Sequence, residues 1–112
     1  MKTRSFLLTL PFLALAALAP LRAEAGSLKI LKFEADWCGA CKKMKPVFAS
    51  VAGSHSGVSF QTVNVDRQAS LADQYKVELL PTIVAVKDGR VVGRLTGYQS
   101  EAKLKSFVKK HQ

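Results

Sequence analysis

Two cysteines three positions apart, Cys38 and Cys41, are the residues of this chain best suited to covalent chemistry, and they are its only cysteines. The apolar run 28–34 before them predicts a strand, and apolar positions at helical spacing in 42–51 predict a helix after them. Both sulfur atoms are therefore expected at a helix N-terminus, where unpaired backbone N–H groups and the helix dipole favour an anion. A cysteine thiolate is such an anion, and it is the nucleophilic form of the residue.

The placement of each cysteine predicts its role. Cys38 would lie at the mouth of the helix, within reach of solvent, and is expected to be the nucleophile. Cys41 would lie one turn further in and more covered, and is expected to be the resolving thiol that closes an internal disulfide. A purely structural bridge is the weaker interpretation, because closing a loop of four residues restricts the unfolded chain little, on the order of 2 kcal/mol.

Other motifs accompany the cysteine pair. Trp37 precedes the first cysteine, Pro46 lies five residues after the second, Leu80-Pro81-Thr82 would open a later strand, and Gly97 follows. With the Trp-Cys-Gly-Ala-Cys-Lys run, these motifs resemble the thioredoxin family from about residue 28 to the C-terminus. The resemblance implies an enzyme, a protein-disulfide oxidoreductase of thioredoxin-like α/β fold, with no metal or organic cofactor.

The resemblance also implies a substrate-binding surface around the cysteines. An X-Pro bond that opens a strand is often cis, and in thioredoxin-like proteins this loop lies against the cysteine pair. The backbone of the residue before the proline then pairs with the substrate chain. The implied substrate-binding residues are Trp37, Gly39, Ala40, Leu80, Pro81 and Gly97. For Trp37, packing against the helix is an equally good interpretation.

Two charged residues interrupt the first apolar strand. Many thioredoxins carry a buried aspartate six residues before the nucleophilic cysteine, and this chain has Lys32 there; the basic partner often found on the second strand is replaced by Thr62. Strand alternation puts Lys32 and Glu34 on one face. We expect the two to pair and Glu34 to take over proton transfer to and from Cys41. The alternative is that both side chains are solvated at the surface.

The remaining elements follow from patterning. Strands are predicted at 58–65, 82–86 and 90–95 and a short helix at 68–75, with a hairpin turn at Asp88-Gly89 and a final helix capped by Ser100. The inner face of that helix would be Leu104, Phe107 and Val108, while His55 and His111 are expected in a polar loop and a fraying end. The result is a trimmed βαβαββα core, a mixed four-stranded sheet with helices on both faces.

Residues 1–25 read as a signal peptide, which leaves residues 26–112 as the thioredoxin-like domain. Lys2 and Arg4 precede an almost wholly apolar run, 5–21, and Ala23-Glu24-Ala25 supplies a cleavage site. The run is short for a membrane span, which needs about 20 residues, although an uncleaved anchor is the alternative. Export implies a compartment where disulfides persist, the periplasm if the source is a Gram-negative bacterium.

The chain is basic, with a net charge of +9, of which +7 remains in residues 26–112. A solvated surface is the simplest interpretation, and attraction to acidic proteins or an anionic membrane is the alternative. Nucleic acid is not expected as a partner, because basic and aromatic residues do not interleave. The expected partners are proteins with disulfides or dithiols and a redox protein that supplies or removes electrons, with the chain itself a monomer.

Three functions remain in competition. The first is an exported reductase or electron relay, favoured because the run around Cys38 resembles the C-terminal thioredoxin-like domain of the membrane transporter that feeds electrons to the periplasm. The second is a disulfide-introducing oxidase of the same fold. The third, from another class, is a carrier that binds Cu(I) or Zn(II) through the two thiolates. A structural zinc site needs four ligands, and Met44 is better explained as a core residue than as a copper ligand.

Overall fold

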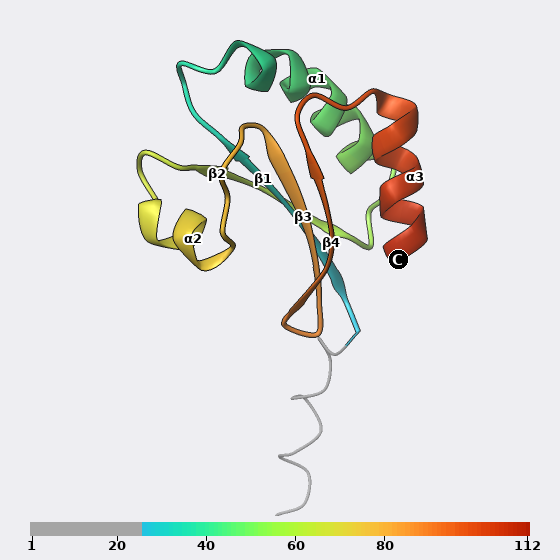
Figure 1. Ribbon diagram of the computed structural model, residues 1–112. Helices are drawn as coiled ribbons and strands as arrows, with labels where there is room; N and C mark the ends of the chain where they lie inside the picture. The colour runs from blue at the N-terminus through green and yellow to red at the C-terminus, as the bar shows by residue number, and fades with distance from the viewer. Residues whose placement is uncertain (1–25) are drawn as a thin grey trace, which may run out of the picture.

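The computed structural model describes residues 26–112, which form one sheet and three helices (Figure 1). In chain order these are β1 (Leu28–Glu34), α1 (Gly39–Gly53), β2 (Ser59–Asn64), α2 (Ala69–Gln74), β3 (Thr82–Lys87), β4 (Arg90–Thr96) and α3 (Glu101–His111). The order confirms the predicted βαβαββα core. The predicted signal peptide, residues 1–25, lies outside the described residues.

The sheet is mixed, as predicted, with strand order β2-β1-β3-β4. β1 and β2 are parallel, and β3 runs antiparallel to both β1 and β4. Because β1 and β2 are parallel neighbours, their C-terminal ends meet at the same edge of the sheet. The loops that follow them, which include Cys38 and Asp66, are therefore brought together.

Helices cover both faces of the sheet (Figure 1). On one face α1 and α3 pack over β1 and β3 around Ile30, Met44, Ile83 and Leu104. On the other face α2 covers a second cluster that includes Leu31, Phe33, Ala72 and Val84. The alternation of β1 side chains between two apolar clusters explains why this strand reads as an almost continuous apolar run.

Local signals in the sequence determine several element ends. Asp88 and Gly89 both have positive φ, 55° and 78°, as a two-residue hairpin turn requires. The Ser100 side chain accepts a hydrogen bond from the Lys103 N–H and so caps α3, as predicted. His111 is not frayed: it ends α3, and its ring contacts the Phe107 ring edge-on, 4.8 Å between centroids.

Candidate active site

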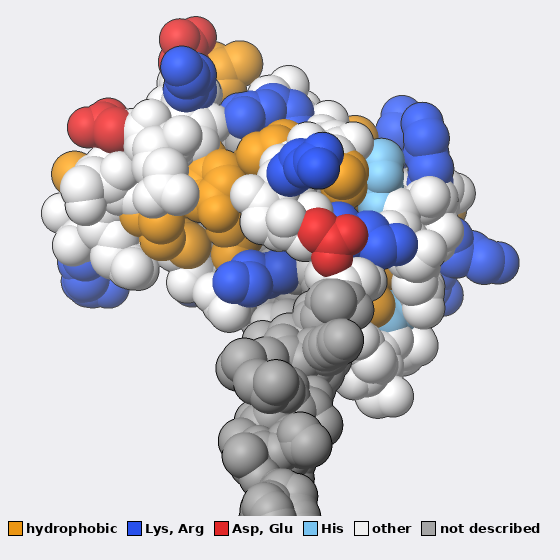
Figure 2. All heavy atoms as spheres, turned by 90° about the horizontal axis from the view of Figure 1, so that it is seen from below, with side chains coloured by type: hydrophobic (Ala, Val, Ile, Leu, Met, Phe, Trp, Pro, Cys, Tyr) orange, Lys and Arg blue, Asp and Glu red, His pale blue; other side chains and the backbone are white. Residues whose placement is uncertain are grey.

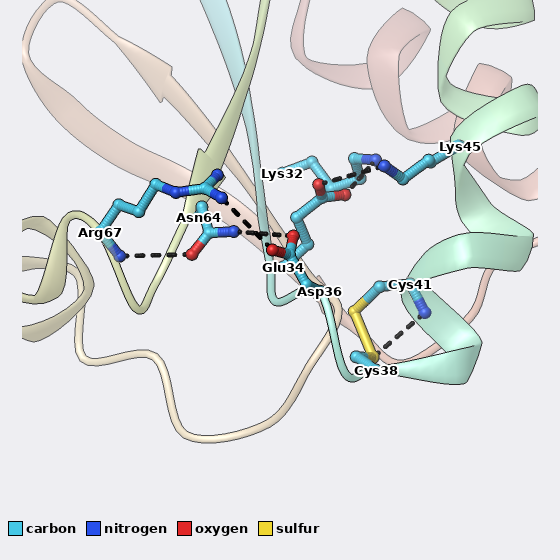
Figure 3. Close-up of polar contacts among 8 residues, drawn as sticks. All are labelled: Lys32, Glu34, Asp36, Cys38, Cys41, Lys45, Asn64 and Arg67. Carbon is cyan, nitrogen blue, oxygen red and sulfur yellow. Dashed lines mark hydrogen bonds and ion pairs between the residues drawn. A yellow bond between two sulfur atoms is a disulfide. The ribbon is translucent and has the colours of Figure 1, made fainter.

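The cysteine pair lies at the N-terminus of α1, which begins at Gly39, three residues earlier than the apolar spacing indicates. Cys38 is the N-cap residue, and Cys38 and Cys41 form a disulfide with Cα atoms 5.2 Å apart (Figure 3). The Cys41 N–H donates to the Cys38 sulfur over 3.1 Å. When the pair is reduced, this first-turn N–H is positioned to stabilise negative charge on the Cys38 sulfur.

The two sulfur-bearing residues differ in accessibility. Cys38 is 8% exposed and Cys41 is 1% exposed, so Cys38 is less open than its position at the helix mouth predicts, yet more open than Cys41. Ala35 and Cys41 pack with Cys38 in a small apolar cluster that also touches Ala40 and Leu80. A partner sulfur can therefore approach Cys38 more readily than Cys41, as the nucleophile and resolving roles require.

An apolar groove of about 440 Å³ begins at Cys38. It is lined by Trp37, Cys38, Val65, Ala72, Val77, Glu78, Leu79 and Leu80. Leu79, at 62%, is among the most exposed large hydrophobic side chains of the described residues. The sequence pattern identified Trp37, Cys38 and Leu80 but missed the other apolar lining residues, because a half-buried valine or an exposed leucine in a loop has no local signature.

Trp37 is a surface residue and not part of the packing of α1. Its indole is 70% exposed, and its Nε1 donates to the Asp66 carboxylate over 3.0 Å. The interpretation that Trp37 serves to pack against the helix is therefore wrong. Asp66 was missed, although its position directly after β2 is a usable signal, since β1 and β2 end at the same edge.

The loop before β3 lies against the disulfide. The Leu80–Pro81 bond is cis, as predicted, and the Leu80 side chain packs on the cysteine cluster. Gly97, with φ of +84°, donates its N–H to the Pro81 carbonyl over 2.7 Å. The structure thus brings together Trp37, Ala40, Leu80, Pro81 and Gly97 around the cysteines. Gly39 forms the exposed start of α1 between them.

Lys32 and Glu34 form a buried ion pair on the α1 side of β1. Lys32 Nζ donates to Glu34 Oε1 over 2.8 Å, and both residues are buried. This confirms the predicted pairing, and the alternative of two solvated side chains is wrong. Lys32 Nζ also lies 5.0 Å from the centroid of the Phe48 ring, a cation–π contact. Thr62 is the register neighbour of Lys32 on β2, where the family's basic residue was expected.

Glu34 has a second basic neighbour. Lys45, one helical turn beyond Cys41, places Nζ 3.7 Å from Glu34 Oε2 and is itself 60% exposed (Figure 3). The Glu34 carboxylate therefore lies between a buried ammonium group and a solvent-exposed one. The sequence does not single out Lys45, because its contact with Glu34 depends on how α1 packs over β1.

A surface network joins the loops after β1 and β2. Asp36 accepts hydrogen bonds from Asn64 over 3.1 Å and from Arg67 over 3.3 Å (Figure 3). Asn64 in turn accepts from the backbone N–H groups of Asp66 and Arg67. These contacts fix the segment that carries Trp37 relative to the loop that carries Asp66.

The described residues provide neither a cluster of metal ligands nor a membrane-spanning helix. Within 26–112, no group of three or more His, Cys, Asp or Glu side chains could hold a metal ion. Met44 is fully buried in the core, and its sulfur accepts from the Gln99 N–H over 3.4 Å. Over the same range, none of the helices combines the length and apolar character needed to cross a bilayer.

A reactive disulfide at a helix N-terminus, an adjoining apolar groove and a facing cis-proline define a thiol–disulfide oxidoreductase of thioredoxin-like fold. A family model described as thioredoxin matches residues 21–110. The chain therefore belongs to the thioredoxin family.

Known proteins similar to this chain come from distant organisms. Thioredoxin from Mycoplasma pneumoniae is 43% identical over 79 residues, covering 70% of this chain and 78% of that protein. Thioredoxin H2-1 from Oryza sativa subsp. japonica is 44% identical over 70 residues, covering 62% of this chain and only about half, 51%, of the rice protein. The X-ray structure of Fasciola hepatica thioredoxin superposes with a TM-score of 0.76 at 34% identity, covering 82% of this chain and 88% of that one.

Proposed function

We propose that this protein is an exported oxidoreductase that reduces disulfides of partner proteins or relays electrons to them. One observation carries the proposal: Cys38, the more accessible cysteine, accepts a helix N–H at its sulfur and lines an apolar groove, while Cys41 is almost wholly buried. This arrangement suits a nucleophile that meets an outside disulfide and a second thiol that meets only the first.

The exchange proceeds in two steps. The Cys38 thiolate attacks one sulfur of a partner disulfide; a Cys38–partner bond forms, the partner disulfide breaks, and the released partner thiolate takes up a proton. Cys41 then loses its proton and attacks the Cys38 sulfur. The Cys38–Cys41 bond forms and the second partner sulfur leaves as a thiolate. Two electrons have passed to the partner, and a dithiol protein must reduce Cys38 and Cys41 again.

The groove would hold the partner segment during this exchange. Trp37 and Leu80 flank Cys38 and offer an apolar surface, and the Leu80 backbone precedes the cis bond at Pro81. Gly97 and the first two residues of α1, Gly39 and Ala40, border the same region without large side chains. An extended segment with an apolar residue beside its cysteine fits this site best.

Glu34 is proposed to accept the proton that Cys41 releases. It is the buried carboxylate that follows Lys32 on β1, adjacent in sequence to Ala35, which packs on Cys41. Lys32 would hold the carboxylate in place, and the exposed Lys45 offers a route by which the proton reaches solvent.

The Glu34 role is tested by Glu34→Gln, which preserves the shape of the side chain and an acceptor for Lys32. The variant should slow the resolution of a mixed disulfide and alter the pH dependence of that step. The matched control is Asp36→Asn, two residues along and exposed, which should leave the pH profile as in the wild type. Identical profiles for Glu34→Gln and the wild type would remove Glu34 from the mechanism.

The reducing direction is proposed on the likeness of the Ala-Asp-Trp-Cys-Gly-Ala-Cys-Lys run to the electron-transporter domain. The reduction potential tests it, by equilibrating the Cys38–Cys41 pair with glutathione buffers. A value near or below about −250 mV is expected, in the range of thioredoxin. A value above about −150 mV would make the protein a disulfide-introducing oxidase. Failure to form the disulfide at all would favour the metal-binding carrier, which bound copper or zinc in reduced protein would then reveal.

Export is proposed from the sequence of residues 1–25, a basic start, an apolar run and Ala23-Glu24-Ala25. The mass of the protein recovered from the producing cell tests it. Cleavage after Ala25 predicts a chain that begins at Gly26 and is found outside the cytosol. An intact N-terminus on protein found only in the cytosol would remove export while leaving the oxidoreductase chemistry untouched.

A further inference from the structure

The end of the molecule opposite the cysteines has a distinct charge. We define the base as the start of β1, the β3–β4 turn and the last turn of α3. Lys87 links the three, because it pairs with Leu28 of β1 and donates its Nζ to the His111 carbonyl over 3.4 Å. Its basic residues are Lys29, Lys87, Arg90, Lys109 and Lys110. Figure 2 views this end and shows Lys and Arg side chains spread around the point where the described chain begins.

Acidic residues are almost absent from the base. Residues 26–112 contain seven acidic side chains, and only Asp88 lies there. Its carboxylate already accepts a hydrogen bond from the Gly26 N–H. The other six lie in the half that holds the cysteines or on α2: Glu34, Asp36, Asp66, Asp73, Glu78 and Glu101. The base therefore carries a net charge of +4 (five basic residues and one acid) out of the +7 of residues 26–112, whereas elsewhere the nine basic residues are mixed with six acids.

We propose that the base binds the anionic surface of a phospholipid bilayer. Five basic residues set against one engaged carboxylate complement a layer of anionic headgroups, and Arg90, Lys109 and Lys110 are exposed. Gly26, the first described residue, also lies at the base, since its N–H is bonded at the β3–β4 turn. Where residues 1–25 are retained, the apolar run 5–21 is joined to the domain at this face.

Binding through the base has a geometric consequence. β1 runs the length of the domain from the base to the cysteine loop, and its seven residues span about 23 Å at the usual rise of a strand. The groove beside Cys38 would then face away from the bilayer. The partners within reach would be proteins that stand above the membrane surface, rather than disulfides at the level of the headgroups.

The test compares two triple variants with equal loss of charge, each in the full chain as the cell produces it. The base variant is Arg90→Gln with Lys109→Gln and Lys110→Gln, and the control is Lys42→Gln with Lys43→Gln and Lys103→Gln at the opposite end. Binding is measured by sedimentation with two kinds of vesicle, phosphatidylcholine alone and phosphatidylcholine mixed with the anionic lipid phosphatidylglycerol. The salt is kept at about 0.05 M, because higher salt screens the attraction between exposed basic side chains and the headgroups.

The quantity measured is the preference for anionic over neutral vesicles, which stays defined even where residues 1–25 are retained and bind both. The base variant should lose about fivefold in this preference for each charge removed, or about a hundredfold for all three, while the control keeps most of it. Equal loss in both variants, or no anionic preference in the wild type, would overturn the proposal. Binding to poly-glutamate without a vesicle preference would also overturn it, in favour of an acidic protein.

Discussion

Two carboxylates at the end of β1, Glu34 and Asp36, each form an ion pair, one buried and the other exposed to solvent (Figure 3). Lys32 and Glu34 meet at 2.8 Å with side chains only 2% and 9% exposed. Asp36 and Arg67 meet at 3.3 Å with side chains 72% and 71% exposed. The pairs use the same chemistry, so the difference between them comes from the surroundings: α1 covers the first pair, and solvent surrounds the second.

The comparison shows where a charged side chain lowers the stability of this fold. An exposed pair gains little, because water and salt screen it, and such pairs contribute about 0–1 kcal/mol. A buried pair must offset the loss of hydration of both ions, and removing one partner leaves the other uncompensated. A buried pair beside the cysteine cluster is therefore poorly explained by stability alone, which agrees with the proposed role of Glu34.

Lys32→Met should have the largest effect on stability. It leaves the Glu34 carboxylate buried with only the exposed Lys45 nearby, so the free energy of unfolding should fall by about 3–5 kcal/mol. Urea unfolding of oxidised protein at neutral pH measures it. A loss below about 1 kcal/mol would mean that Glu34 is well solvated in solution, contrary to the structure.

The double variant Lys32→Met with Glu34→Leu should be more stable than Lys32→Met alone, by about 2 kcal/mol or more. Apolar side chains can replace a buried pair at little cost, because no charge then remains without a partner. Unfolding of the wild type, both single variants and the double variant gives the coupling energy. Additive single effects would show that the two side chains do not interact.

Phe48→Leu should have an intermediate effect, a loss of about 1–2 kcal/mol. The change removes the ring beneath Lys32 and its edge-on contact with Phe60, while keeping an apolar side chain in the core. The same substitution in the Lys32→Met background should cost less, since the cation–π contact is already gone. An equal cost in both backgrounds would assign the whole effect to packing.

Arg67→Gln should have the smallest effect, below about 1 kcal/mol at low ionic strength. Raising the salt to about 1 M shortens the screening length to about 3 Å, so the difference from the wild type should vanish. The Lys32→Met loss should persist in the same salt, because solvent ions do not reach the buried pair. A salt-insensitive loss in Arg67→Gln would mean that the surface network holds the loop by more than charge.

Short-range sequence signals predict most of the helices, strands and turns of this molecule. The apolar run before Cys38, the helical spacing after Cys41, the Asp88-Gly89 turn and the Ser100 cap each act over a few residues, so they predict their elements without knowledge of the rest. The prediction that Cys38 is the nucleophile and Cys41 the resolving thiol rests in the same way on local position, since Cys38 is the N-cap of α1 and Cys41 lies in its first turn.

Tertiary structure decided the rest, because burial depends on what packs from elsewhere in the chain. The same strand alternation that puts Lys32 and Glu34 on one face permits either a solvated or a buried pair, and α1 selects the buried one. The exposure of Trp37 likewise depends on Asp66, 29 residues away, which holds the indole outward. Sequence alone determined the reactive pair and the elements that carry it; the packing of α1 and the meeting of β1 with β2 determined its surroundings.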